Sequence, residues 1–155
     1  WPENCHTKIP ITNTRGQSTK DVIKSLSAQG VKLNVTVVFT PAQARVAVQA
    51  LSPDVSSYIS VFAGRIADTG VDPLPIVREV LQMIRQGPRP KTELLWASTK
   101  ELYNIVQAEQ AGCSIITVGY DILDRLHVIG RSLEDSSLDM IKMFFEATQA
   151  SGLSI

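Results

Sequence analysis

Cysteine is scarce in this chain, and long apolar runs are absent. Its 155 residues include two cysteines, Cys5 and Cys113, with no motif between them. Two isolated cysteines make no disulfide framework, so we expect a reduced protein of the cytoplasm. No apolar run approaches the ~20 residues of a membrane-spanning helix, so we expect no membrane partner. The first residues, Trp1 to Asn4, have neither the basic start nor the apolar stretch of a signal peptide.

The chain also lacks net charge. Lysine plus arginine and aspartate plus glutamate number 15 each, which gives a formal charge of zero. A neutral chain is not expected to bind nucleic acid through a broad basic surface, although one or two local cations can hold a small anion. The histidines, His6 and His127, show no metal-ligand spacing, so we expect no metal site. The chain has no Gly-x-Ser-x-Gly nucleophile motif and no glycine-rich loop for a nucleotide cofactor.

What the chain does have is a regular alternation of strand-like and helix-like segments. Strand-like runs rich in β-branched residues cover residues 5–11, 31–39, 58–62, 93–97 and 114–118, and a helical stretch follows each. Helix starts are signalled by a capping box from Thr40 to Gln43, by Asp72 before a proline, and by a second capping box from Ser98 to Glu101. Strict β-α alternation predicts a parallel α/β sheet in a single domain over residues 1–155.

Two α/β architectures fit five β-α units. One is a doubly wound sheet, and the other is part of a parallel (β/α)8 TIM barrel. A complete barrel has eight strands and typically ~250 residues. The barrel interpretation therefore requires N-terminal units that are missing from this sequence, and periodicity alone does not choose between the two.

Polar residues gather toward the carboxyl ends of these strands, where parallel α/β folds carry their chemistry. Lys8 lies in an otherwise apolar segment, and Asn34 and Thr36 are two apart, so both point to one side of their strand. Ser60 and Phe62 share a face of the third strand, and Arg65 lies just beyond it. Ser98 closes the fourth strand, and Lys100 comes two residues later.

Each of these residues also has a purely structural interpretation. Lys8 could lie at a sheet edge with its amine in solvent, and Ser98 could simply cap a helix. Arg65 could pair with Asp68 or Asp72 at the surface. The joint pattern is more specific than any one member.

The order and spacing of the segments resemble the transaldolase family. The most telling pieces are Asn-x-Thr at residues 34–36 and Ser-x-Phe-x-Gly-Arg-Ile at residues 60–66, with Lys-Ile-Pro-Ile-Thr at 8–12 and Trp-Ala-Ser at 96–98. The resemblance runs from about residue 7 to the end of the chain. It implies the C-terminal part of a (β/α)8 barrel, beginning at the strand that carries the Schiff-base lysine.

The resemblance also implies roles for the residues at the sugar. Lys8 would be the amine that forms a Schiff base with a ketose, and Thr36 would help to position the catalytic water. Asn34 and Ser60 would hold hydroxyls of the bound dihydroxyacetone unit, and Phe62 would wall the pocket. Burial of Lys8 would disfavour its ammonium form and free the amine for attack. This chemistry requires no metal and no organic cofactor.

Arg65, Ser98 and Lys100 would grip the sugar phosphate, Ser98 with the help of a helix N-terminus. Lys100 departs from the arginine of many transaldolases and loses the bidentate fork. The related fructose 6-phosphate aldolases can have lysine there, whereas Phe62 favours a transaldolase because those aldolases place tyrosine at that position. The function therefore stays open between transfer of dihydroxyacetone between sugar phosphates and its release.

Alternatives from other classes also remain: a non-catalytic fragment or partner subunit, and a small flavodoxin-like binding module. In the family, carboxylates on the first and third barrel strands supply the acid and base, and neither strand is in this sequence. We therefore expect these 155 residues to be inactive alone. We expect the chain to form a homo-oligomer or to be completed by a missing N-terminal segment.

Overall fold

The computed structural model describes residues 4–88 and 90–152. It divides the chain into two compact units, the first ending at Leu123 and the second beginning at Asp124. The expectation of a single domain over residues 1–155 stays a prediction. Among the described residues, no helix is both long and apolar enough to cross a membrane.

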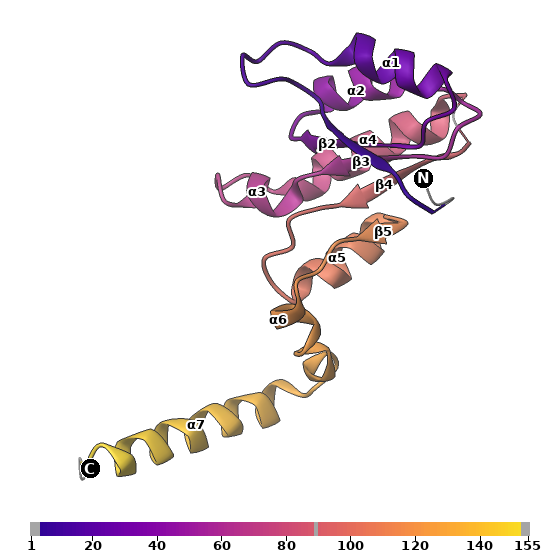
Figure 1. Cartoon of the computed structure of the whole chain (residues 1–155). Coiled ribbons are helices and arrows are strands. Elements are labelled where there is room, and N and C mark those ends of the chain that lie inside the picture. Colours follow the sequence, from indigo (N-terminus) through magenta and orange to yellow (C-terminus); the bar gives the residue numbers. More distant parts are fainter. Residues whose placement is uncertain (1–3, 89, 153–155) are drawn as a thin grey trace. The chain divides into compact units, whose positions relative to one another are not determined.

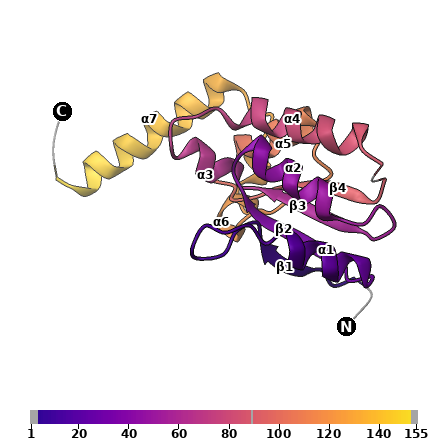
Figure 2. The same ribbon diagram turned by 90° about the horizontal axis from the view of Figure 1, so that it is seen from above.

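The first unit is built on a five-stranded sheet. Its strands are β1 (Thr7–Pro10), β2 (Leu33–Val38), β3 (Ser57–Val61), β4 (Thr92–Trp96) and β5 (Ile115–Ile116). All neighbours are parallel and stand in sequence order, which can be followed from β1 to β4 in Figure 2. A doubly wound sheet reverses its strand order at a switch point, and this sheet does not. The expected parallel α/β fold is confirmed, the order fits an arc of a TIM barrel, and a flavodoxin-like sheet is excluded.

Helices form a layer beside this sheet. They are α1 (Lys20–Ala28), α2 (Pro41–Ala50), α3 (Ala63–Ala67), α4 (Pro73–Gln86), α5 (Tyr103–Ala111) and α6 (Tyr120–Leu123). In the larger four, α1 packs on α2, α2 on α4 and α4 on α5, so their order follows that of the strands (Figure 1). This is the outer layer that successive β-α units build in a barrel.

The hydrophobic core lies between that layer and one face of the sheet. Alternate strand residues point into it and are almost fully buried: Leu33, Val35, Ile59, Val61, Leu94 and Trp96. The helices contribute small or β-branched residues such as Ile23, Ala47 and Val80. Each fully buried large side chain stabilises the fold by about 1.5–3 kcal/mol. Because side chains alternate along a strand, the residues between these core positions face the other side, which we call the open face.

Two of the three predicted helix starts are confirmed. The Thr40 hydroxyl accepts from the Gln43 backbone N–H, and the Gln43 side chain accepts from the Thr40 N–H, which completes the capping box of α2. The Asp72 carboxylate accepts from the Leu74 N–H at the start of α4. Caps of this kind typically contribute about 1 kcal/mol each.

The third predicted start, the capping box from Ser98 to Glu101, is wrong. Ser98 has a left-handed backbone with φ of 65°, and α5 begins only at Tyr103. The intervening turn is held by the Asn104 side chain, whose oxygen accepts from the N–H groups of Lys100 and Glu101 at 2.9 and 3.1 Å. Ser98 therefore lies just after β4 and does not cap a helix.

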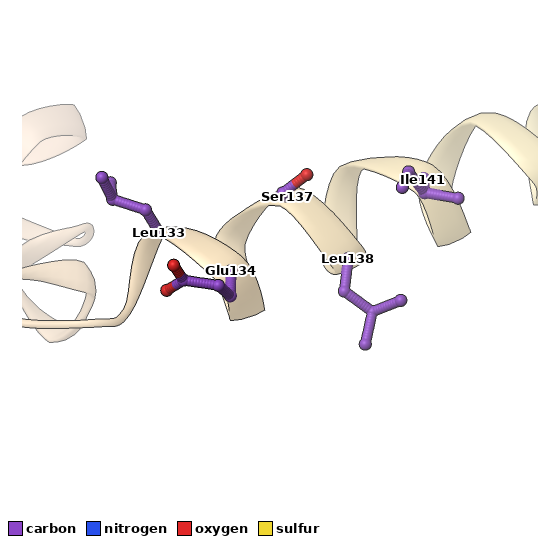
Figure 3. A pocket seen from close by; sticks show the side chains of 5 residues that line it. All are labelled: Leu133, Glu134, Ser137, Leu138 and Ile141. Carbon is purple, nitrogen blue, oxygen red and sulfur yellow. The ribbon is translucent and has the colours of Figure 1, made fainter.

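The second unit contains a 3-10 turn, η1 (Leu126–Val128), and a long helix, α7 (Leu133–Ala150). The Ser132 hydroxyl accepts from the Asp135 N–H and so caps α7. No residue of α7 is buried, and its large apolar side chains are exposed: Leu133, Leu138, Met140, Ile141, Met143, Phe144 and Phe145. Figure 3 shows a shallow depression on α7, lined by Leu133, Glu134, Ser137, Leu138 and Ile141. None of these is a predicted site residue.

Candidate active site

Four predicted residues share the open face of the sheet. Lys8 of β1 and Asn34 of β2 are register partners, and Thr36 lies two residues beyond Asn34. Asn34 is in turn the partner of Tyr58 of β3, and Ser60 lies two residues beyond Tyr58. Residues two apart point to the same side of a strand. Lys8, Asn34, Thr36 and Ser60 therefore stand on three neighbouring strands of one face, and we call them the polar cluster.

A hydrogen bond joins two members of the polar cluster across β2 and β3. The Ser60 hydroxyl donates to the Asn34 side-chain oxygen at 2.6 Å, and Ser60 is only 1% exposed. The bond fixes the Asn34 amide, whose NH2 group remains able to donate. A fixed amide donor beside a hydroxyl is suited to the oxygens of a polyol.

Thr36 has an unusual polar environment. Its Oγ1 is buried and has no hydrogen-bond partner among the described residues. An unsatisfied buried hydroxyl costs about 1–3 kcal/mol, so it is uncommon without a reason. The hydroxyl therefore has a capacity for hydrogen bonds that no described residue satisfies.

Lys8 lies on the open face, but the expected burial among apolar neighbours is wrong for the described residues. The residue is exposed. β1 is an edge strand of the sheet, so no described strand covers its other side. Ile9 and Ile11 pack on the helix side with the core and do not surround the amine. Successive side chains of a strand point to opposite faces of the sheet, so Ile9 and Ile11 lie on the other face from Lys8.

Phe62 lies just beyond β3 and is half-buried. Its ring is 5.9 Å from that of Phe39, which follows β2. Its backbone N–H donates to the Val38 carbonyl at 2.9 Å, so the carboxyl ends of the two strands stay together. The aromatic pair forms an apolar rim at that end of the sheet.

The three predicted phosphate ligands lie on two touching loops. Arg65 belongs to the short helix α3 after β3, while Ser98 and Lys100 follow β4. The loops meet at Gly64, where an added Cβ would come within 1.7 Å of the Ser98 carbonyl oxygen. Only glycine allows so close an approach.

Both cations point to one carboxylate. Lys100 Nζ is 3.1 Å and Arg65 Nη1 is 3.7 Å from Asp68 Oδ2. The pairing of Arg65 with Asp68 is the surface arrangement that the sequence left open as the alternative to phosphate binding. Such exposed pairs contribute only about 0–1 kcal/mol. The arrangement nevertheless brings two positive groups to one oxygen. Ser98 is not at the N-terminus of a helix, so the expected help of helix N–H groups in binding phosphate is absent at Ser98.

The roles of three residues near this end of the sheet were missed by the sequence analysis. Gly64 is needed for the contact between loops, Val37 has a positive φ in a strand, and Asp68, expected only as a possible partner of Arg65, pairs with Lys100 as well. The helix α3 that carries Gly64 and Arg65 has five residues and too little periodicity to be recognised. The Gly-Arg pair directly after a strand was the available signal.

Other features of the described residues do not compete with this site. They contain no group of three or more histidine, cysteine, aspartate or glutamate side chains able to hold a metal. A depression between α2 and α4 is lined by Arg45, Val48, Gln49, Met83, Gln86 and Gly87. It lies on the helix side, away from the open face.

Both cysteines are free, and burial raises the pKa of Cys113 from 9.0 to about 11. Cys113 is therefore a protonated, unreactive thiol at neutral pH.

Known proteins resemble the chain along almost all of its length. The sequence model of the family described as transaldolase/fructose-6-phosphate aldolase matches residues 2–155. A probable transaldolase of Caldicellulosiruptor saccharolyticus is 36% identical over 124 residues, which are 80% of this chain and 54% of that protein. Probable transaldolase 1 of Listeria monocytogenes is 31% identical over 94% of this chain and 63% of its own length. The chain thus spans about half to two thirds of the length of these curated relatives.

Proposed function

Because the chain belongs to the transaldolase/fructose-6-phosphate aldolase family, we propose that it carries the Schiff-base part of a transaldolase site. In this proposal the protein transfers a dihydroxyacetone unit from a ketose phosphate to an aldose phosphate, as a cytoplasmic enzyme of the pentose phosphate pathway. The observation that carries the proposal is the polar cluster. Lys8 is the register partner of an asparagine that Ser60 fixes at 2.6 Å, all on the sheet face opposite the helices.

The proposed reaction begins at Lys8. Its neutral amine attacks the ketose carbonyl, and loss of water gives an iminium. The bond between the α and β carbons of the iminium then breaks, and its electron pair flows into the iminium to form a three-carbon enamine. The hydroxyl of the departing carbon loses its proton to a base and becomes the released aldehyde. The enamine then attacks the aldehyde of an acceptor, and hydrolysis frees Lys8.

The other members of the polar cluster would support these steps. The Asn34 amide and the Ser60 hydroxyl would bind hydroxyls of the three-carbon unit, and Phe62 would border it on the apolar side. The buried hydroxyl of Thr36, which has no partner among the described residues, would hold the water that moves protons. Their fixed geometry would align the bond to be broken, and a misplacement of about 1 Å can cost roughly a hundredfold in rate.

The alternative, release of dihydroxyacetone to water, rests on Lys100. Transfer and release share every step up to the enamine and differ only in what captures it. The test supplies a ketose phosphate with and without an aldose phosphate and analyses the products by mass spectrometry. We expect a new ketose phosphate that requires the acceptor. Free dihydroxyacetone at the same rate with or without acceptor would instead identify an aldolase.

We also propose that Arg65 and Lys100 bind the substrate phosphate, which would take the place of the Asp68 carboxylate between them. Arg65→Ala should raise KM for phosphorylated donors about ten- to a hundredfold, since a charged hydrogen bond is worth roughly 1.5–3 kcal/mol. KM for unphosphorylated dihydroxyacetone donors should change less than about twofold. Steady-state kinetics on both donor types is the measurement.

Arg78→Ala is the matched control for Arg65→Ala. Arg78 is an exposed arginine of α4, on the far side of the sheet from the polar cluster. Its loss should leave both KM values unchanged. Equal losses on both donor types in Arg65→Ala would mean that Arg65 acts only through its ion pair with Asp68.

A further inference from the structure

Strand β2 contains one residue more than the segment of β3 with which it pairs. It pairs with β3 through Asn34 with Tyr58 and Val35 with Ile59, and then through Val38 with Val61. Two residues of β2, Thr36 and Val37, therefore stand opposite the single residue Ser60. This is a β-bulge, which bends a strand and re-aims a side chain.

Val37, one of the two residues in the bulge, has an unusual backbone conformation. Its φ is 62°, and Ser98 is the other non-glycine residue with positive φ among those described. A β-branched residue is strained there because its Cβ crowds the backbone. The Val37 side chain is 37% exposed and is not part of the hydrophobic core, so packing does not explain the conformation.

Contacts on both sides hold the backbone around Val37. The Thr36 carbonyl accepts from the Ile11 N–H at 3.0 Å, and the Val38 carbonyl accepts from the Phe62 N–H at 2.9 Å. Val38 itself is fully buried. The strain is thus maintained by β1, β3 and the core, which is typical of backbone outliers at functional sites.

The residue that the bulge displaces, Thr36, is one of two threonines whose buried hydroxyls have no hydrogen-bond partner among the described residues, and the other is Thr92. Thr36 directly precedes Val37, and its buried Oγ1 has no partner among the described residues. Its register partner on β1 is Pro10, two residues from Lys8, and Ser60 lies across from it on β3. The Thr36 hydroxyl is therefore held between the lysine strand and the strand whose serine binds Asn34.

We propose that Val37 is a positioning residue, whose left-handed backbone creates the bulge that aims the Thr36 hydroxyl at the water or sugar oxygen beside Lys8. The inference rests on the proposed function and extends it to a residue that touches no substrate. Val37 acts through Thr36.

Deletion of Val37 is a selective test. It leaves residues 35, 36 and 38 to pair with residues 59, 60 and 61 in unbroken register, so the core residues keep their partners. The experiment uses the protein encoded by the complete reading frame, with a ketose phosphate donor and an aldose phosphate acceptor. We expect a folded protein with kcat lowered about ten- to a hundredfold and donor KM within about twofold of wild type.

Two more variants make the result independent of how the deletion folds. Val37→Gly keeps the register and the φ value but frees the backbone, and it should lower kcat several-fold at unchanged melting temperature. Val71→Gly, at an exposed loop valine before α4, is the matched control and should retain wild-type kcat.

A double-mutant cycle distinguishes positioning from a general structural role. In a Thr36→Ala background, loss of Val37 should change kcat less than about twofold, because the group that it positions is gone. Equal losses of kcat in the wild-type and Thr36→Ala backgrounds, or wild-type kcat in both Val37 variants, would overturn this inference and leave the proposed function standing. A wild-type protein that turns over no ketose phosphate would overturn the proposed function and this inference with it.

Discussion

Replacing Lys8 by arginine should abolish turnover of ketose phosphates. Guanidinium stays protonated at every working pH and has no lone pair available for attack on a carbonyl, although it preserves charge and most of the length. Loss of a covalent nucleophile typically lowers kcat by roughly 10⁴- to 10⁶-fold. Stability should be little changed, because Lys8 is exposed and lies outside the hydrophobic core. Initial-rate kinetics and thermal unfolding check the two parts of this expectation.

Lys24→Arg is the matched control for Lys8→Arg. Lys24 is an exposed lysine of α1, on the helix side of the sheet. Its replacement should leave kcat and melting temperature at wild-type values. If Lys8→Arg kept more than about a tenth of wild-type kcat, another amine would have to supply the nucleophile.

Gly64→Ala should be the most destabilising single-methyl change at the site. The new Cβ would lie 1.7 Å from the Ser98 carbonyl oxygen and 2.8 Å from Lys100 Cγ, and a backbone atom cannot move aside alone. Overpacking costs up to about 3 kcal/mol, or roughly 10 °C in melting temperature for a protein of this size. Because the loop with Lys100 must shift, KM for phosphorylated donors should rise as well. Calorimetry and kinetics on the same preparation measure both effects.

Gly70→Ala separates crowding from backbone conformation. Gly70 has φ of 81° with nothing within 4 Å of an added Cβ, so its replacement tests backbone strain alone. We expect a loss of about 1–2 kcal/mol with no change in KM. A Gly64→Ala protein no less stable than Gly70→Ala would mean that the two loops do not need their close contact.

The strands and several helix starts follow from local sequence. Thr40 and Asp72 cap their helices as predicted, because a side chain that bonds an N–H two or three residues ahead depends on little else. The periodicity of the sequence could not distinguish a doubly wound sheet from an arc of a barrel. The distinction depends on which strand lies beside which, and that is a long-range property of the sheet.

That several of the candidate residues lie together could be predicted from the sequence, but the detail of their contacts could not. Asn34 and Ser60 belong together because they lie on one face of the neighbouring strands β2 and β3, which spacing and resemblance indicated. The position of Ser98 could not be predicted, since a Ser-x-x-Glu pattern forms a capping box only where the backbone is helical. Here the Asn104 side chain holds the turn by accepting hydrogen bonds from the Lys100 and Glu101 N–H groups. The bulge at Val37 could not be predicted either, because nothing in a run of β-branched residues signals a positive φ.

The formation of a Schiff base at Lys8 is the central claim, and trapping tests it most directly. The protein encoded by the complete reading frame is incubated with a ketose phosphate and reduced with borohydride, and the adduct is mapped by peptide mass spectrometry. We predict one stable secondary amine, on Lys8, that is absent without borohydride and absent from Lys8→Arg. An adduct on Lys20, Lys24 or Lys32 in place of Lys8, or turnover with no trapped adduct, would contradict the assignment.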